Sequence, residues 1–189
     1  MTLWLVRHGL PLVAAGVCYG TLDVAADPHS TRQAAQALAD TLPQGLQVLF
    51  SPLQRCKQLA LDLQGLRPDL LYKCESRLVE MDFGCHEGLR WDGIDPQAYD
   101  AWTADFWNHR FGGMESVADL MARVAALWRE ASGAAQDQVW ITHAGVIRAA
   151  SLLARGVRRI DVASQWPSAA PGFGQWLTVD AGAILTGRP

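Results

Sequence analysis

Three short apolar runs constrain the fold of this chain more than any other feature, because each one ends in polar residues suited to chemistry. The runs, with the residues that follow them, are 3–6 with Arg7 and His8, 46–50 with Ser51, and 139–142 with His143. Runs of this length and composition are typical of strands buried in a sheet. The sequence therefore predicts three buried strands that deliver polar side chains to loops.

Stretches with a helical pattern separate these runs. Helices are predicted at about 31–42, from Ser51 as N-cap to about 63, at 116–132 and at 146–155, with further strands at 70–72 and 175–179. This alternation indicates an α/β fold with a mostly parallel sheet. In such sheets ligands bind beyond the carboxyl ends of the strands, where Arg7, His8, Arg55 and His143 are expected.

Length, charge and cysteine usage exclude several classes of protein. The chain has 189 residues, half of them apolar, which favours one domain spanning 1–189. The net charge is -3 and the basic residues are scattered, so we expect no nucleic-acid partner. The N-terminal apolar run is too short for a signal peptide or a membrane span, so we expect a cytoplasmic protein with no membrane partner. The four cysteines lack the paired spacing of a zinc site, and we expect neither a metal nor a cofactor.

Four motifs follow one another along the chain. They are Arg7-His8-Gly9, Ser51-Pro52-Leu53-Gln54-Arg55, Glu80-Met81-Asp82-Phe83-Gly84 with Glu87-Gly88, and His143-Ala144-Gly145. In this order and spacing they resemble the histidine phosphatase superfamily, also called phosphoglycerate mutase-like, over essentially the whole chain. Within it, Tyr19-Gly20-x-x-Asp23 and Tyr99-x-x-Trp102 look most like the α-ribazole phosphatases of cobalamin synthesis.

The resemblance implies a fold, an activity and a set of site residues. The fold would be a mostly parallel sheet with helices on both faces. The activity would be metal-independent hydrolysis of a small phosphate ester through a phosphohistidine. By resemblance His8 is the nucleophile and Glu80 the general acid. The phosphate and substrate ligands implied are Arg7, Arg55, His143, Gly20 and Ala144.

These residue types suit phosphoryl transfer. Arg7 and Arg55 can hold a phosphate dianion bidentately. A neutral His8 can attack phosphorus, while a protonated His143 and the helix amides beyond it would stabilise the developing charge. An alkoxide leaving group needs a proton, and a bound dianion would keep that proton on Glu80, so we expect its acid form chiefly in the substrate complex.

Structural roles compete with some of these assignments. Glu80 could instead form a salt bridge to an arginine, and Arg55 could lie on an exposed helix face. Ser116 resembles the N-cap of a capping box rather than a nucleophile. In relatives the position of Glu87 more often supports the loop than acts as a second acid.

The segment 89–112 carries six aromatic residues among polar ones. It predicts either a helical cap over the site or a helix that packs its aromatic side chains into the core. A separate departure from the family is Ala14, which stands where many relatives have an Asn that contacts phosphate. This difference bears on substrate affinity rather than on the chemistry.

Two other functions stay open from the sequence. A phosphoglycerate-type mutase is one, but between Gly88 and Gly112 only Arg90 and Arg110 are basic, which is meagre for a bisphosphate intermediate. A non-enzymatic interaction module is the other, although such a module usually loses a core residue and none is lost here. The aromatic segment suits a nucleoside-like ester such as α-ribazole 5'-phosphate. The sequence decides neither the natural substrate nor the oligomeric state.

Overall fold

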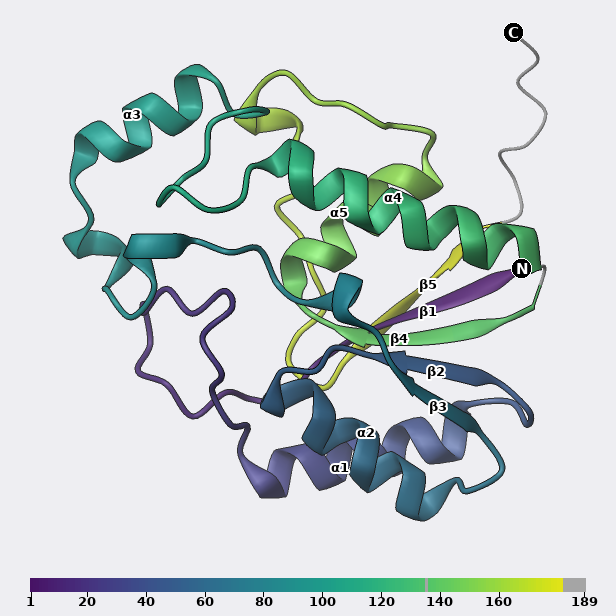
Figure 1. Cartoon of the computed structure of the whole chain (residues 1–189). Coiled ribbons are helices and arrows are strands. Elements are labelled where there is room, and N and C mark those ends of the chain that lie inside the picture. The colour runs from purple at the N-terminus through teal and green to yellow at the C-terminus, as the bar shows by residue number, and fades with distance from the viewer. Residues whose placement is uncertain (135, 182–189) are drawn as a thin grey trace, which may run out of the picture.

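A sheet of five strands in the order β3-β2-β4-β1-β5 organises the chain (Figure 1). The computed structural model describes residues 1–134 and 136–181. The strands are β1 Thr2–Arg7, β2 Gln47–Phe50, β3 Leu71–Cys74, β4 Gln138–Thr142 and β5 Trp176–Asp180. The pairs of β1 with β4, β4 with β2 and β2 with β3 are parallel, and β5 pairs antiparallel with β1. The predicted α/β fold with a mostly parallel sheet is confirmed.

Helices cover both faces of this sheet. The α-helices are α1 Pro28–Thr41, α2 Gln54–Leu66, α3 Pro96–Ala104, α4 Val117–Ala134 and α5 Ala144–Ala154, and short 3-10 turns lie at Ser76–Leu78, Gly84–His86, Trp91–Gly93 and Ala163–Gln165. One face carries α1 and α2 and the other carries α4 and α5 (Figure 1). The helix α3 stands apart, beyond the carboxyl ends of the parallel strands.

Two apolar cores form because successive side chains of a strand point to opposite faces of the sheet. Leu3 and Leu5 of β1 and Trp140 of β4 pack with α4 and α5. Val6 and Ile141 pack with α1 and α2 on the opposite face. Burial on both faces explains why these strands are continuous apolar runs in the sequence rather than alternating ones.

The starts of two helices differ from the prediction. The helix α1 begins at Pro28, because the Asp27 carboxylate accepts a hydrogen bond from the amide of Ser30 (2.8 Å) and proline suits the first turn. The helix α2 begins only at Gln54, whose amide donates to the carboxylate of Asp23 (2.7 Å). The predicted role of Ser51 as the N-cap of α2 is therefore wrong.

The predicted capping box at the start of α4 is confirmed. The hydroxyl oxygen of Ser116 accepts from the amide of Asp119 (3.1 Å), and the carboxylate of Asp119 accepts from the amide of Ser116 (3.1 Å). Ser116 is thus satisfied as a helix cap.

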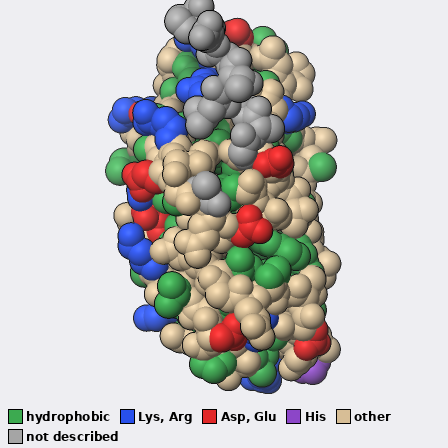
Figure 2. All heavy atoms as spheres, turned by 90° about the vertical axis from the view of Figure 1, so that its right-hand side faces the viewer, with side chains coloured by type: hydrophobic (Ala, Val, Ile, Leu, Met, Phe, Trp, Pro, Cys, Tyr) green, Lys and Arg blue, Asp and Glu red, His purple; other side chains and the backbone are tan. Residues whose placement is uncertain are grey.

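The surface at the amino ends of the parallel strands lies on the side of the molecule opposite their carboxyl ends. Acidic and basic side chains are interspersed there among neutral ones (Figure 2). No helix in the part of the chain that the structure describes has the length and apolar character to span a membrane.

Trp140 is the largest side chain that is fully buried, and its ring lies 6.4 Å from that of Trp128, edge to face. Trp140→Ala should lower the free energy of unfolding by about 3–5 kcal/mol, because it leaves a cavity between β4 and α4. Urea denaturation followed by circular dichroism measures this loss. The control is Leu71→Ala on the edge strand β3, where the side chain is 64% exposed. Its effect should stay within about 0.5 kcal/mol, and equal losses for both variants would contradict the packing described.

Candidate active site

A cavity of about 230 Å³ lies at the carboxyl ends of the strands and brings most of the predicted residues together. It is lined by Arg7, His8, Val17, Tyr19, Gly20, Glu80, Phe83, Trp91, Ala144 and Arg148. Arg55 and His143 do not line this cavity and are fully buried behind its wall. The predicted residues therefore form two layers, one facing the cavity and one supporting it.

His8 follows β1 and has a fixed ring orientation. Its Nδ1 lies 2.7 Å from the carbonyl oxygen of Gly9, which can only accept, so Nδ1 carries the proton. The lone pair therefore stands on Nε2. A Cβ at position 9 would collide with the hydroxyl of Thr31 in α1, which explains the glycine after His8.

Arg7, the last residue of β1, rests on a loop that follows α5. Its guanidinium carbon lies 4.0 Å from the centre of the Phe173 ring, and its Nη1 donates to the carbonyl oxygen of Pro171 (3.0 Å). The Phe173 ring also lies 5.5 Å from the His8 ring. The segment 166–174 thus forms a wall that supports both side chains. No pattern in the sequence had indicated this contact.

Arg55 is fully buried, so it does not lie on an exposed helix face. It donates to the carbonyl oxygens of Leu22 (2.8 Å) and Gly20 (2.7 Å), and its Nε donates to Nδ1 of His143 (3.2 Å). Among the described residues, no carboxylate forms an ion pair with it. Burial lowers the pKa of Arg55 from its ordinary value. Because a buried charge without a counter-charge is costly, this arrangement favours an anionic ligand nearby.

His143 is held at both ring nitrogens. Its Nδ1 accepts from Arg55, so the proton of the neutral ring is on Nε2, which donates to the hydroxyl of Ser51 (2.9 Å). The ring lies 5.1 Å from that of His8. Sequence analysis predicted a protonated His143, but the ring is neutral in this arrangement. An imidazolium has no lone pair to accept the hydrogen bond from Arg55. Ser51, predicted as a helix cap, instead orients this ring.

Burial and positive charge keep both histidines neutral. Burial, and after it the charge of Arg55, lowers the pKa of His8 to about 3. Burial, followed by the influence of His8 and Arg55, holds the pKa of His143 well below its ordinary value. A neutral imidazole is the form that can act as a nucleophile.

The carboxylate of Glu80 is held by backbone amides. Its Oε2 accepts from the amide of Gly145 (3.0 Å) in the first turn of α5, and its Oε1 accepts from the amide of Met81 (3.0 Å). The N-terminus of a helix favours such an anion. Within the described chain, no ion pair joins Glu80 to Arg7 or Arg55, so the salt-bridge alternative is not observed. The amide of Gly145, expected to face phosphate, is bonded to Glu80.

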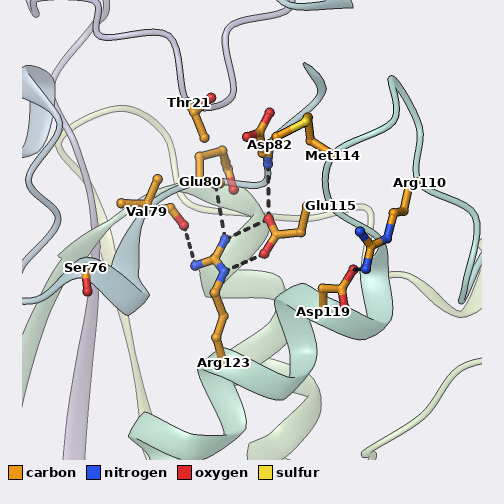
Figure 3. A pocket seen from close by; sticks show the side chains of 10 residues that line it. All are labelled: Thr21, Ser76, Val79, Glu80, Asp82, Arg110, Met114, Glu115, Asp119 and Arg123. Carbon is orange, nitrogen blue, oxygen red and sulfur yellow. Dashed lines mark hydrogen bonds and ion pairs between the residues drawn. The ribbon is translucent and has the colours of Figure 1, made fainter. Parts of the chain in front are cut away.

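Arg123 of α4 fixes the segment that carries Glu80, as Figure 3 shows from the neighbouring pocket. It donates to the carbonyl oxygens of Val79 (2.6 Å) and Glu80 (3.1 Å). Glu115 pairs with Arg123 at 2.7 Å and accepts from the amide of Asp82 (3.1 Å). The backbone is therefore held on both sides of Glu80, which fixes the position from which its side chain reaches the cavity.

Glu87 supports the loop that carries Gly20. Its carboxylate accepts from the amides of Thr21 (2.7 Å) and Leu22 (2.6 Å). Among the described residues, the hydrogen bonds that the Glu87 carboxylate accepts come from this loop and from the turn that follows Glu80. The expectation that Glu87 supports the loop agrees with this geometry.

The aromatic segment forms a cluster beside the cavity. Phe111 lies at its centre, with ring-centre distances of 4.4 Å to Trp102 and 6.2 Å to Trp91, and both pairs are stacked. Phe106 and Phe111 are buried, whereas Trp91 lines the cavity. The interior of the segment thus packs as core, and its edge at Trp91 faces the cavity.

Arg148 lines the cavity and was not identified from the sequence. Its Nη2 donates to the carbonyl oxygen of Ser168 (3.1 Å), while its Nε is buried without a partner among the described residues. Residues four apart on a helix share a face, so the position of Arg148 one turn beyond Ala144 is a signal that could have found it.

Comparison with known proteins finds one matching family and several similar solved structures. Residues 3–164 match the family model described as "Histidine phosphatase superfamily (branch 1)". A search of curated proteins gives no match. Among solved structures, mycobacterial glucosyl-3-phosphoglycerate phosphatase is similar at 27% identity and a TM-score of 0.78, covering 94% of this chain and 88% of its own. A protein from Thermus thermophilus is similar at 29% identity and a TM-score of 0.70, covering 95% of this chain and 94% of its own.

The lowered pKa of His8 predicts how stability depends on pH. Between pH 6.5 and about 3 the unfolded chain binds a proton at this residue that the folded chain does not, so the free energy of unfolding should fall as the pH is lowered. His8→Asn removes this contribution, which is about 1 kcal/mol between pH 6 and 5. Urea unfolding of both proteins from pH 5 to 8 measures the difference. The difference should be constant above about pH 7.5, and equal slopes at lower pH would contradict the buried neutral imidazole.

Proposed function

The chain belongs to the histidine phosphatase superfamily (branch 1), and on that premise we propose that it hydrolyses the phosphate ester of a small metabolite through a phosphohistidine at His8. The observation that carries this proposal is the ring orientation of His8. Nδ1–H donates a hydrogen bond to the carbonyl oxygen of Gly9, so the lone pair is on Nε2, in a side chain that lines the cavity. The lowered pKa keeps that lone pair free at neutral pH.

The phosphate group is bound beside His8 by positive charge from both layers of the site. Arg7 contacts phosphate oxygens directly, and its buried Nε has no partner in the described chain. Arg55 and His143 act from behind the wall. A phosphate dianion raises the proton affinity of His143, so the imidazolium and the guanidinium of Arg55 stabilise the anion electrostatically through the wall. Ala14 is exposed and does not line the cavity, so it contributes no phosphate ligand.

Glu80 serves as the general acid and then as the general base. In the first step Nε2 of His8 forms a bond to phosphorus, the bond to the leaving oxygen breaks, and Glu80 gives its proton to that oxygen. In the second step water attacks phosphorus, Glu80 takes a proton from the water, and the bond from phosphorus to Nε2 breaks. Two hydrogen bonds that hold Glu80 beside the cavity support this role: the amide of Gly145 donates to its carboxylate, and Arg123 donates to its backbone carbonyl oxygen.

The specific substrate we propose is α-ribazole 5'-phosphate, since the aromatic segment beside the cavity suits a nucleoside-like ester. Glucosyl-3-phosphoglycerate is a second candidate, because the phosphatase that is 27% identical to this chain is named for it. A mutase is disfavoured, since Arg90 is paired with Asp92 (2.6 Å) and Arg110 with Asp119 (3.2 Å). Hydrolysis rates for the two candidates and for 3-phosphoglycerate separate these functions.

His8→Asn should lower turnover of any phosphate ester by a factor of about 1,000 or more, because it removes the covalent route. In the wild type, rapid quenching without acid should trap labelled phosphate on His8. No group of three or more His, Cys, Asp or Glu side chains in the described residues is placed to hold a metal ion, so EDTA should leave the rate unchanged. Label on another residue, or activity that EDTA abolishes and a divalent ion restores, would count against the proposal.

Glu80→Gln should slow release of an alkyl alcohol, a poor leaving group, by about 100-fold or more. The penalty should be much smaller with p-nitrophenyl phosphate, because that leaving group departs without a proton. Values of kcat/KM for the two esters in wild type and variant test this. If Glu80 only positioned an arginine, both esters would slow alike, and equal losses would remove it from the acid role.

A further inference from the structure

The cavity of about 230 Å³ that His8 lines is called the phosphate cavity below. A second cavity of about 310 Å³ adjoins it. The two share Glu80, Phe83, Trp91 and Arg148 as lining residues. The pocket on the other side of Glu80, drawn in Figure 3, shares only Glu80 with the phosphate cavity among the described residues. The four shared residues make the second cavity the space next to the phosphate cavity that a group attached to the phosphate would enter, and we call it the leaving-group cavity.

Five of the twelve described residues that line the leaving-group cavity are aromatic, and Phe83 is one of them. Trp91, Trp102 and Phe106 come from the aromatic segment, and Trp166 comes from the loop after α5. The rings of Trp102 and Phe106 are stacked with centres 5.3 Å apart, and Trp166 lies 6.3 Å from Phe106, edge to face. Such walls favour a flat ring over a chain of hydroxyl groups.

Two N–H groups around this cavity lack an acceptor. The indole Nε1 of Trp102 and the Nε of Arg148 are buried and have no hydrogen-bond partner among the described residues, and both residues line the cavity. Buried donors without partners are rare because they lose their bonds to water and gain none in return. Two such unused donors on residues that line one cavity favour a ligand with an acceptor atom, which would bond them once the side chains turn toward it.

We propose that the leaving-group cavity is a specificity site that takes an aromatic or heteroaromatic group carrying a hydrogen-bond acceptor, which Trp102 and Arg148 recognise through these N–H groups. The proposal rests on the proposed phosphatase function, because the cavity is defined relative to the bound phosphate. Apart from Glu80, Arg148 is the only charged side chain among the described residues that line it. A leaving group with a second phosphate is therefore matched by a single cation.

Model esters test the two features of the ligand separately. Benzyl phosphate and cyclohexylmethyl phosphate differ in the flat ring, and the three pyridylmethyl phosphates add an acceptor nitrogen to the benzyl ring. In wild type, kcat/KM should be about tenfold higher for benzyl than for cyclohexylmethyl phosphate. At least one pyridylmethyl isomer should exceed benzyl phosphate by about tenfold, the scale of one hydrogen bond.

Trp102→Phe removes the indole N–H and keeps a ring, so it should lower the pyridylmethyl-to-benzyl ratio of kcat/KM about tenfold. Arg148→Met should lower the same ratio. The matched control is Trp107→Phe, since Trp107 belongs to the same segment but lines neither cavity and contacts Arg159 (5.7 Å). This control should leave the ratio unchanged, and circular dichroism verifies that each variant is folded.

Acetyl phosphate separates failure of this proposal from failure of the phosphatase function, because its leaving group is too small to need the second cavity. If acetyl phosphate is hydrolysed only when His8 is present, the phosphatase function stands. In that case, a wild type that prefers cyclohexylmethyl phosphate, or a ratio that Trp102→Phe and Trp107→Phe change alike, overturns the specificity site. If His8-dependent hydrolysis of acetyl phosphate is absent, both proposals fail.

Discussion

The buried guanidinium of Arg55 connects the elements that form the candidate site. It extends from α2, bonds the carbonyl oxygens of Gly20 and Leu22 in the N-terminal loop, and bonds the ring of His143 after β4. Because a buried charge is tolerated only when its N–H groups are bonded, these three elements must meet around it. The carboxylate of Glu87 accepts hydrogen bonds from amides of the same loop whose carbonyl oxygens accept from Arg55. A positive side chain therefore binds the carbonyl oxygens of this loop and a negative one binds its amides, which fixes Gly20 at the cavity wall.

Arg123 shows why the environment of Arg55 is more than structural. Both arginines donate to backbone carbonyl oxygens of loops near the site. Arg123, however, is paired with Glu115 at 2.7 Å, whereas no carboxylate in the described chain pairs with Arg55. Fixing a loop thus does not require an unbalanced charge in this protein. The positive charge around His8 is a separate property, and it favours the binding of an anion.

The sequence predicted the parts of the site that depend on local patterns. Short apolar runs located β1, β2 and β4, and the positions just after them located Arg7, His8 and His143. It failed where segments distant in sequence meet. The hydroxyl of Ser51 bonds His143 instead of capping α2, and Phe173 packs under Arg7, both through contacts between elements. Periodicity within one helix or strand carries no information about such contacts, so only tertiary structure reveals them.

The bounds of α3 are a different case, because the sequence predicted a helix within 89–112 without bounds although the signal for its start is local. Asp95 caps it by accepting from the amide of Gln97 (2.9 Å), and Pro96 occupies its first turn. These two residues form a start signal that the dense aromatic residues obscured.

The residues around His8 and the residues around the leaving-group cavity belong to different parts of the fold. The first set stands at the ends of β1 and β4 and on α2, which the sheet and both cores hold in place. The aromatic walls come from α3, its flanking loops and the loop after α5, and α3 lies apart from the sheet (Figure 1). Changes in these walls leave the sheet ends in place, so substrate preference can change while the chemistry is kept. The chemistry proposed at His8 is therefore compatible with a natural substrate other than the one for which the similar mycobacterial phosphatase is named.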